Sequence, residues 1–459
     1  MQDIVNQQEN VKAELEETSQ FARTFTFKRL LKFVLPSVIM MVFTSIYGVI
    51  DGIFVSNFAG EPAFAAVNLI MPVLMAFATV GFMIGAGGAA LVSKTLGEGK
   101  KDRACGIFSF LIYVTIILGL VMTAVGIIFM PDLARLMKAK GDTLDKCVLY
   151  GRINMAGITL FMLQNVFQSF FPAAEKPKLG LLFIVSAGVT NAILDAVFLA
   201  WFKWGIAGAA AATVTGQAVG GLAPVFYFII NRKGVLKLGK PTIDFRALGK
   251  TCANGSSELM TNLSLSLVNI LYNYQLMRLI GESGVAAYGV LMYVNFIFVA
   301  VYIGYSVGAS PIIGFNYGAG NKAELKNVLK KSLIIIAITS VAMFGLAMAL
   351  AYPLPYIFVG YNAELLSLTR RGFMICASMF LVLGFNIFGS AFFTALNNGL
   401  ISAILSFIRT LLLQVGCVLT LPLLWGVDGI WSANVFAELI AIFVTFTFIL
   451  LFRKKYGYL

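Results

Sequence analysis

Long apolar runs alternate with short polar segments along almost the whole chain. A helix needs about 20 consecutive, largely apolar residues to cross the hydrocarbon core of a bilayer. Twelve runs of this kind can be found, and each is a predicted membrane span. Their approximate positions are 31–55, 64–92, 104–130, 149–174, 180–201, 206–230, 252–279, 286–313, 332–352, 372–396, 401–423 and 429–452. The pattern predicts an all-α polytopic membrane protein with twelve transmembrane helices.

The two halves of the chain repeat each other at a constant offset of 221 residues. The matching pairs include Gly60 with Gly281, Gly87 with Gly308, Gly97 with Gly318, Gly99 with Gly320, and Trp204–Gly205 with Trp425–Gly426. Because each half has an even number of spans, both halves enter the membrane from the same side. We therefore predict two parallel six-helix lobes related by a pseudo-two-fold axis, an arrangement typical of secondary transporters that work by alternating access.

This repeat sets the predicted domain boundaries. A cytoplasmic N-terminal segment at 1–24 precedes an N-lobe at 25–230, and a basic cytoplasmic linker at 231–250 follows that lobe. A C-lobe at 251–455 and a short tail at 456–459 complete the sequence. We expect no cleavable signal peptide, because the first 20 residues are polar and acidic and lack an apolar core segment.

The distribution of basic residues predicts the orientation in the membrane. The chain has 34 Lys and Arg against 21 Asp and Glu, for a formal net charge of +13. If both termini lie inside, 24 of the 34 basic residues fall on the inner side. Since Lys and Arg collect on the cytoplasmic side, we predict a multi-pass protein of the cell membrane with both termini in the cytoplasm. Nucleic-acid binding is not expected, because the basic residues are dispersed among short loops.

The composition excludes several classes of enzyme. The chain is 59% hydrophobic, 12% charged and contains no histidine. Ser-His-Asp and Cys-His catalysis and an HExxH zinc site are therefore impossible. The five cysteines form no CxxC pair, and the sequence has no GxxxxGK[ST] phosphate-binding loop. We expect neither an enzyme nor an ATP-driven pump, and any proton coupling has to use carboxylates.

Four acidic residues lie inside predicted spans: Asp51, Asp195, Glu258 and Glu438. Each costs about 2.5–3.5 kcal/mol at the centre of a membrane helix, so such residues usually face a cavity, a partner or an ion. Asn191 precedes Asp195 by one turn, which places an amide and a carboxylate on one helix face. Oxygen ligands of this kind suit either Na⁺ or a proton site. Asp51 and Asp195 are predicted at similar depth in the same lobe, where they can share a cavity.

Each of these residues also has a purely structural interpretation. Asp51 fits an interfacial carboxylate in water, and Asp195 fits a structural hydrogen bond. Glu258 follows a polar stretch and fits an exposed or capping position. Glu438 and Arg409, which both lie inside spans, fit an ion pair between two helices.

The sequence resembles the multidrug and toxic compound extrusion (MATE) family, in particular its bacterial DinF-like branch. The resemblance covers about 25–455 and depends on several motifs together. These are Pro36 and Asp51 in the first span, GEGKKDRA after the second, NAILDAVF in the fifth, WGIAGAA opening the sixth, and GESGVAAYGV with GASPIIGFNYGAGNKAELKN in the second half. The resemblance implies a monomeric two-lobe antiporter without a cofactor, which exports cationic, amphipathic drugs or toxic organic compounds in exchange for H⁺ or Na⁺.

The resemblance also implies particular site residues. The coupling site for a proton or Na⁺ would comprise Asp51, Asn191, Asp195 and Thr213, with Gln168 as a further member. The secondary candidates are Pro36, Tyr150, Glu258, Glu438 and Arg409. Proline removes a backbone hydrogen bond and bends a helix, so Pro36 either links the shape of the first span to Asp51 or causes a harmless kink.

Other functions fit parts of this pattern. A lipid or lipid-linked-sugar flippase of a related superfamily needs several Arg or Lys to hold phosphate, whereas Arg409 is the one clearly intramembrane basic residue. A major-facilitator transporter also has twelve spans in two halves, but GEGKKDRA differs from the loop signature of that family. A channel or sensor does not require a two-lobe repeat. The antiporter is our main hypothesis, and the flippase is the alternative.

Overall fold

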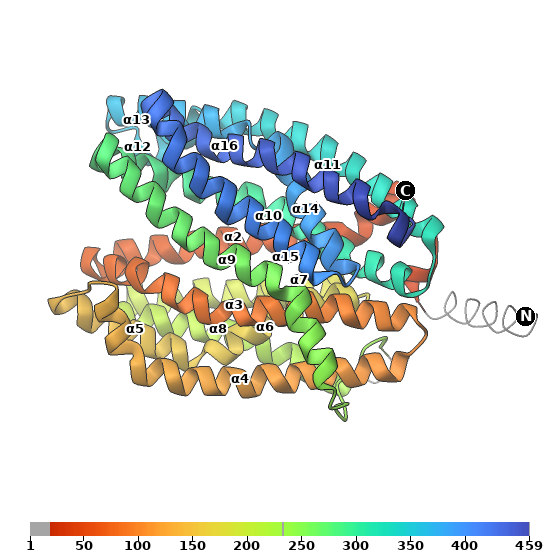
Figure 1. Ribbon diagram of the computed structural model, residues 1–459. Coiled ribbons are helices and arrows are strands. Elements are labelled where there is room, and N and C mark those ends of the chain that lie inside the picture. The colour runs from red at the N-terminus through yellow and green to blue at the C-terminus, as the bar shows by residue number, and fades with distance from the viewer. Residues whose placement is uncertain (1–18, 232–233, 459) are drawn as a thin grey trace, which may run out of the picture.

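The computed structural model describes residues 19–231 and 234–458, and every regular element within these ranges is a helix. The first of the two lobes forms the lower half of Figure 1. Its elements are η1 (Gln20–Ala22), α2 (Phe27–Phe54), η2 (Val55–Ala59), α3 (Glu61–Gly97), α4 (Lys101–Leu136), α5 (Gly141–Ala156), α6 (Ile158–Ala173), α7 (Pro177–Asp195), η3 (Ala196–Trp201) and α8 (Gly205–Ile230). Most of the predicted N-terminal segment, at 1–18, lies outside the described residues.

Most of the C-lobe forms the upper half of Figure 1, while the first turns of its helix α9 extend down beside the N-lobe. Its elements are α9 (Phe245–Leu279), α10 (Glu282–Gly318), α11 (Lys322–Leu350), α12 (Pro353–Val359), α13 (Ala363–Ala377), α14 (Phe380–Ala395), α15 (Gly399–Phe407), η4 (Ile408–Leu413) and α16 (Gln414–Tyr456). The segments η2, η3 and η4 are π-helical and continue the α-helices before them.

The helices of the described ranges account for twelve membrane spans. Eight of them are long and apolar enough to cross a membrane unaided, and the bent pair α13–α14 makes a ninth. The pair α5–α6 and helix α9 have lower hydropathy because they carry polar residues such as Asp145 and Glu258. The continuous unit from α15 to α16 supplies two spans, because Gly426 interrupts α16 with φ 55° and ψ −126°. The all-α, twelve-helix fold predicted from the sequence is confirmed.

The 221-residue repeat is visible in the backbone as well as in the sequence. Gly60 and Gly281 have φ angles of 88° and 80°, and Gly205 and Gly426 have φ angles of 57° and 55°. Only glycine adopts such left-handed conformations without strain. Equivalent turns of the two halves therefore contain glycines with similar φ angles, and the lobes are two copies of one parallel six-helix arrangement (Figure 1).

The lobes meet through glycines at the end of the molecule where both termini lie (Figure 1). A Cβ atom on Gly97 of α3 would lie 2.0 Å from the carbonyl oxygen of Phe315. A Cβ atom on Gly318 of α10 would lie 2.0 Å from the carbonyl oxygen of Lys94. These two contacts are equivalent in the repeat, because Lys94 and Phe315 are also 221 residues apart. We call this pair of backbone contacts the glycine seal.

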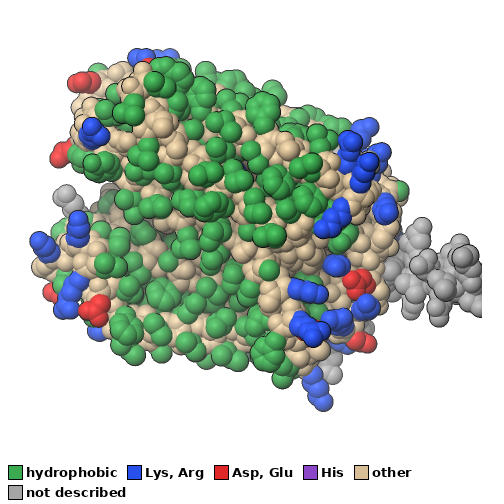
Figure 2. Space-filling model, in the orientation of Figure 1, with side chains coloured by type: hydrophobic (Ala, Val, Ile, Leu, Met, Phe, Trp, Pro, Cys, Tyr) green, Lys and Arg blue, Asp and Glu red, His purple; other side chains and the backbone are tan. Residues whose placement is uncertain are grey.

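The lobes separate toward the opposite end of the molecule. Figure 2 shows the surface hollowed between the lobes at the end away from the termini. Because the glycine seal closes the other end, this conformation opens toward one side of the membrane only.

The middle of the molecular surface is apolar and suits contact with lipid. Green hydrophobic side chains cover it in Figure 2, while Lys and Arg gather at the end that carries the termini. Ile128 of α4 and Phe443 of α16, for example, are 66% and 74% exposed. An exposed apolar surface of this extent marks a membrane-facing region, as the predicted spans require.

The linker between the lobes is shorter than predicted. Helix α9 begins at Phe245, so the last residues of the predicted 231–250 linker belong to the C-lobe. The Asp244 carboxylate caps this helix by accepting a hydrogen bond from the amide of Ala247 at 3.0 Å, and it pairs with Arg103 of α4 at 3.2 Å. The Ala247 amide, with help from Arg103, holds the pKa of Asp244 below its usual range. The cap attaches the start of the C-lobe to the N-lobe.

Residues 19–25, which we call the N-terminal strap, connect the two lobes at the closed end. The Ser19 hydroxyl donates a hydrogen bond to the carboxylate of Glu175, between α6 and α7 of the N-lobe. The Phe25 amide donates to Glu324 of α11 in the C-lobe at 2.8 Å. The strap is therefore attached to one carboxylate of each lobe.

The pH dependence of the strap tests this arrangement. Glu175 is only 8% exposed, and its burial raises the pKa of its carboxyl above the usual range. Below about pH 4.3, the ordinary pKa of Glu, this carboxyl contributes fully to the stability of the docked strap. That contribution is lost as the pH rises through the raised pKa of Glu175. We expect hydrogen exchange of residues 20–25, corrected for intrinsic rates and followed by mass spectrometry, to speed up with rising pH in this way. Glu175→Gln should remove the dependence, and an unchanged dependence in that variant would contradict the assignment.

Candidate functional site

The N-lobe contains a group of polar side chains near the open end of the molecule. Asp51 lies close to the end of α2, Asn191 and Asp195 lie in the last turns of α7, and Thr213 lies on α8. The Asp51 carboxyl interacts with the side chains of the three other residues. We call these four residues the N-lobe cluster. The structure brings together the residues that the sequence analysis assigned to ion coupling, and their role stays a prediction.

Two glycines allow the helices of this cluster to approach closely. A Cβ atom on Gly188 of α7 would lie 2.6 Å from the ring of Phe43 on α2. A Cβ atom on Gly216 of α8 would lie 2.9 Å from the carbonyl oxygen of Ala187 and from the Cβ of Asn191. Small residues at helix contacts let membrane helices pack at short range. Helix α7 therefore fits tightly between α2 and α8, which carry the other members of the cluster.

Asn191 and Asp195 of the N-lobe cluster are buried, Asp51 and Thr213 are half-buried, and the cluster has unsatisfied polar atoms. Asp195 is 0% exposed and Asn191 is 4% exposed. Asp51 Oδ1, both carboxylate oxygens of Asp195 and Asn191 Nδ2 are buried, and within the described part of the chain none has a hydrogen bond of normal geometry. Buried polar atoms without partners are costly. Two adjacent carboxylates also repel each other unless a proton or cation lies between them. The arrangement is suited to taking up one or the other.

The donor atoms of the N-lobe cluster match those preferred by a hard cation. Asp51 and Asp195 supply carboxylate oxygens, Asn191 supplies an amide oxygen, and Thr213 supplies a hydroxyl oxygen. The Thr213 hydroxyl donates its proton to the carbonyl of Ala209 at 3.0 Å, so its lone pairs remain free to accept. Ligand sets made of oxygen atoms suit hard cations such as Na⁺ rather than softer metals. The same oxygens can also hold a shared proton.

Irregular helix geometry accompanies both aspartates. The π-helical segment η2 begins four residues after Asp51, and η3 begins directly after Asp195. Such segments are rare and often occur at functional sites, because they change the register of the side chains that follow. Tyr150 of α5, a secondary candidate, is buried beside the N-lobe cluster and interacts with Asp51 and Thr213.

One predicted member lies apart from this group. Gln168 of α6 is buried, and no contact joins it to the N-lobe cluster in the part of the chain that the structure describes. Gln164, one turn earlier, donates a hydrogen bond at 3.4 Å to the hydroxyl of Tyr47, which lies one turn before Asp51. The amide that approaches the cluster is therefore that of Gln164. The role of Gln168 in ion coupling stays a prediction, because spacing alone does not tell which turn of a helix faces its neighbour.

Pro36 contributes to lobe contact rather than to the N-lobe cluster. Helix α2 continues from Phe27 to Phe54 with Pro36 inside it. The next residues, Ser37 and Val38, approach Gly304 of α10 in the other lobe, where an added Cβ would lie 2.6 Å from the Cα of Val38. Pro36 is therefore part of the segment on which the lobes meet.

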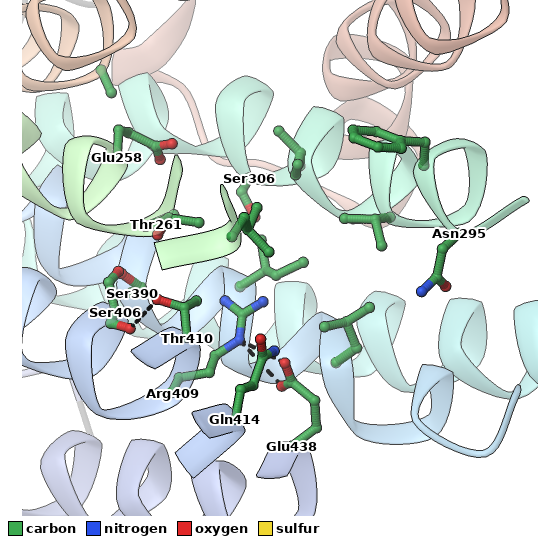
Figure 3. Close-up of a pocket in the computed structure, with 18 of the residues that line it drawn as sticks. Glu258, Thr261, Asn295, Ser306, Ser390, Ser406, Arg409, Thr410, Gln414 and Glu438 are labelled. Carbon is green, nitrogen blue, oxygen red and sulfur yellow. Dashed lines mark hydrogen bonds and ion pairs between the residues drawn. The ribbon is translucent and has the colours of Figure 1, made fainter. Parts of the chain in front are cut away.

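A cavity of about 220 Å³ lies between the lobes and is lined mainly by the C-lobe helices α9, α10, α14 and α16. Ala86 and Ser169 of the N-lobe also line it, whereas Asp51 and Asp195 are not among its lining residues. Figure 3 shows Glu258 and other polar side chains of this C-lobe wall. Asp51 and Asp195 lie together, as expected from the sequence, and the N-lobe cluster that contains them is separate from this cavity.

The C-lobe wall contains a buried ion pair. Arg409 Nε donates to the two carboxylate oxygens of Glu438 at 2.9 and 3.2 Å, and Glu438 is 2% exposed. Asn386 of α14 also donates to this carboxylate at 2.7 Å, and its own amide oxygen accepts from Thr445 at 3.0 Å. The ion pair that the sequence analysis raised as an alternative is present. Asn386 was missed, although a lone amide in the apolar run LVLGFNIFG marks it.

Glu258 does not cap a helix. It lies well inside α9, which begins at Phe245, and its side chain lines the cavity. No hydrogen bond to its carboxylate is found within residues 19–231 and 234–458. The capping interpretation is wrong, because α9 begins more than three turns before Glu258.

Comparison with known families agrees with this two-lobe architecture. A sequence profile of the MatE family matches residues 36–197 and 259–419, one segment in each lobe and together most of the chain. The chain belongs to the MatE family. It is therefore a membrane transporter and not an enzyme, while its assignment to the DinF-like branch stays a prediction.

Curated relatives of this MatE protein are export proteins. The chain is 22% identical over 453 residues to the multidrug export protein MepA of Staphylococcus haemolyticus, covering 96% of this chain and 97% of the relative. It is 24% identical over 348 residues to MepA of Staphylococcus aureus, covering 75% of each chain.

Solved structures share the fold over nearly the full length. A structure described as the outward-facing conformation of a multidrug resistance MATE family transporter matches with a TM-score of 0.89 at 23% identity, covering 94% of this chain and 97% of the other. A transporter of the MOP superfamily from Pyrococcus furiosus, described as having a binding pocket of reverse polarity, matches with a TM-score of 0.87 at 23% identity, covering the same shares of both chains.

The buried ion pair of this MatE protein makes a testable contribution to stability. Arg409→Gln leaves the Glu438 carboxylate charged and unpaired, which we expect to cost about 3–5 kcal/mol. The double variant Arg409→Gln with Glu438→Gln removes both charges and keeps the side-chain shapes. Its unfolding temperature should therefore be close to that of the wild-type protein. Thermal unfolding of the detergent-solubilised proteins measures this difference. Equal destabilisation of the single and double variants would show that shape, not charge pairing, matters here.

Proposed function

We propose that this MatE protein is a secondary antiporter that exports cationic, amphipathic organic compounds in exchange for H⁺ or Na⁺. Three features support the proposal. The N-lobe cluster offers buried, unsatisfied oxygens for an ion. The cavity between the lobes combines the free carboxylate of Glu258 with the apolar and adaptable side chains of Met292, Phe296 and Met379. The relatives that match over most of the chain are named as multidrug export proteins.

The N-lobe cluster and the cavity are separate. This separation supports coupling of the ion to the organic compound through a conformational change, rather than through direct competition for one site. Uptake of a cation or proton by Asp51 and Asp195 relieves their repulsion and draws α2 and α7 together. Helix α2 also contacts α10 of the C-lobe around Gly304. A movement of α2 therefore changes the contact between the lobes and, through that contact, the cavity.

The contacts between the lobes also support alternating access, with the protein in one orientation in the membrane. The glycine seal closes one end of the molecule, and this end carries the excess of Lys and Arg seen in Figure 2. Because basic residues collect on the cytoplasmic side, this end is cytoplasmic in our proposal. The conformation described here would then open to the outside, where substrate is released.

The composition of the cavity speaks against the flippase alternative. A phosphate-bearing lipid would need several basic side chains, and among the described residues that line the cavity Arg409 is the basic one. Its Nε is already bonded to Glu438. The carboxyl group of Glu258, which lines the cavity without a hydrogen bond among the described residues, suits a cationic group instead.

Export driven by an ion gradient tests the coupling proposal. At about 100 mV each exchanged charge carries about 2.3 kcal/mol, which corresponds to roughly 50-fold accumulation. In proteoliposomes with ethidium, we expect Asp51→Asn and Asp195→Asn each to abolish the gradient-driven part of export, because each removes a negative charge from the N-lobe cluster.

The control variant is Asp132→Asn, which changes an exposed aspartate paired with Arg135 outside the cluster. Imposing a Na⁺ gradient and a pH gradient separately identifies the coupling ion. If both cluster variants transport like the wild-type protein under either gradient, the N-lobe cluster is not the coupling site.

A disulfide across the closed end tests alternating access and orientation together. A Cβ atom on Gly314 of α10 would lie 3.3 Å from the Cβ of Ser93 on α3, close to the ~3.8 Å typical of disulfides. In a background lacking the five free cysteines, we expect Ser93→Cys with Gly314→Cys to stop export from intact cells after oxidation by copper phenanthroline. Membrane-permeant dithiothreitol should restore export, whereas impermeant 2-mercaptoethanesulfonate should not.

Each single cysteine variant, treated in the same way, is the control for this experiment. Undiminished export with the bond formed would contradict alternating access by lobe separation. Restoration by the impermeant reductant would place the closed end outside the cell.

A further inference from the structure

The N-terminal strap is attached to the N-lobe at both of its ends. At its start, the Gln20 amide donates a hydrogen bond to the Glu175 carboxylate at 2.9 Å. At its other end, the chain enters α2 of the N-lobe at Phe27. Arg29, in the first turn of α2, also donates to the Gln20 carbonyl. When the two lobes move as units, the strap therefore moves with the N-lobe.

The middle of the strap is held by the C-lobe instead. The Phe25 amide donates to the Glu324 carboxylate of α11 at 2.8 Å. The Phe25 carbonyl accepts hydrogen bonds from Asn327 at 3.1 Å and from Lys331 at 2.6 Å, one and two turns further along the same helix. Helix α11 of one lobe thus satisfies both backbone polar groups of a residue that belongs to the other lobe.

Two buried phenylalanines add apolar contacts to these hydrogen bonds. Phe21 and Phe25 are 0% and 1% exposed. The Phe21 ring contacts both Phe33 of α2 and Phe315 of α10, with centroid distances of 5.4 and 5.6 Å. Aromatic pairs at these separations attract each other and bury a large apolar area. Asn316 of α10 also donates to the Phe21 carbonyl at 3.4 Å. Phe21 is therefore packed against both lobes at once.

The strap lies directly beside the glycine seal. Phe315, whose ring contacts Phe21, is also the residue whose carbonyl oxygen meets Gly97 of α3 in the seal. If the lobes separate at this end, Gly97 moves away from Phe315. The strap, which is fixed to the N-lobe, then has to leave α10 and α11. Opening of the seal and release of the strap from the C-lobe are therefore parts of one movement.

We propose that the N-terminal strap is a latch, which holds the closed end shut and has to leave its C-lobe site before that end can open. The docked strap stabilises the conformation described here, because its contacts require both lobes to be close together. The strap therefore sets how large a fraction of the molecules is open at this end. This inference rests on the alternating access of the proposed function and adds to it the segment that controls one of the two openings.

A reporter cysteine in the seal region tests the latch. Ser93 of α3 is 0% exposed and faces Gly314 of α10. In the background lacking the five free cysteines, Ser93→Cys should react with N-ethylmaleimide only when the closed end opens. Truncation of a buried phenylalanine strongly destabilises the conformation that contains its contacts. We expect Phe21→Ala and Phe25→Ala each to raise the labelling rate of the purified, detergent-solubilised protein by about tenfold or more.

The matched control is Phe108→Ala. Phe108 of α4 is also 0% exposed, but its ring contacts Phe170 and Phe228 of its own lobe, at 4.9 and 5.0 Å. Its truncation weakens the N-lobe core in both conformations alike, so the labelling rate should change by less than about threefold. An increase as large as that of the strap variants would show general loosening of the protein and would overturn the latch.

A milder variant keeps both phenylalanines in place. Lys331→Met removes one hydrogen-bond donor to the Phe25 carbonyl while keeping a long side chain. We expect it to raise the labelling rate by about threefold or more, because hydrogen bonds from charged groups are among the stronger ones. This variant tests the latch even if the phenylalanine truncations prevent folding.

The coupling between strap and seal must also act in the reverse direction. The disulfide formed in Ser93→Cys with Gly314→Cys closes the seal covalently. We expect it to slow hydrogen exchange of residues 20–25 by roughly tenfold at constant pH, because the Phe25 amide exchanges only after leaving Glu324. The same protein after reduction is the control. Unchanged exchange with the disulfide formed would show that the strap opens independently of the lobes, which overturns the latch.

The outcomes separate the latch from the proposed function. If the labelling rate is unchanged in the strap variants and in Lys331→Met, the latch is overturned, while arrest of export by the disulfide between positions 93 and 314 still upholds alternating access. If that disulfide forms and export continues undiminished, alternating access fails and the latch fails with it.

Discussion

The glycine seal is the contact on which the rest of the structure depends. At Gly97 and Gly318 the backbones of α3 and α10 meet directly, and any side chain at either position would collide with a carbonyl of the other lobe. Because the two contacts are related by the internal repeat, they close one end symmetrically and leave the lobes free to diverge at the other. Backbone surfaces without interlocked side chains can also separate without repacking a core. The seal is therefore compatible with the opening and closing that a transporter needs.

Both lobes place polar groups on the same three helices of the repeat, but the chemistry differs. The first, fifth and sixth spans carry the N-lobe cluster in one lobe and Glu258, Arg409 and Glu438 in the other. The N-lobe cluster has only acidic and neutral groups with unsatisfied oxygens, which suits a small cation or proton. The C-lobe adds a guanidinium that neutralises one carboxylate and leaves another free. In our proposal, one helical framework thus provides a site for an ion and a larger site for an organic molecule.

Much of the fold and part of the site followed from local sequence properties. The spans follow from runs of apolar residues, and Asn191 with Asp195 lie on one face because four residues make about one helical turn. The π-helical segments after Asp51 and Asp195 carry no equivalent signal, since they depend on how neighbouring helices pack. For the same reason, the sequence does not show that Gln164, and not the predicted Gln168, contacts Tyr47. Both lie on the same face of α6, and only the contact with Tyr47 on α2 separates them.

The sequence by itself determined twelve membrane helices, a parallel repeat and a small set of carboxylates placed at membrane depth. These properties are local, because apolar length and helical periodicity act within single segments. Only the tertiary structure decided that Asp51 meets Asp195, that the cavity lies apart from them on the C-lobe wall, and that Arg409 pairs with Glu438. Such relations depend on the rotation and spacing of helices far apart in the chain, and these are set by close packing at positions such as Gly188, Gly216 and the glycine seal.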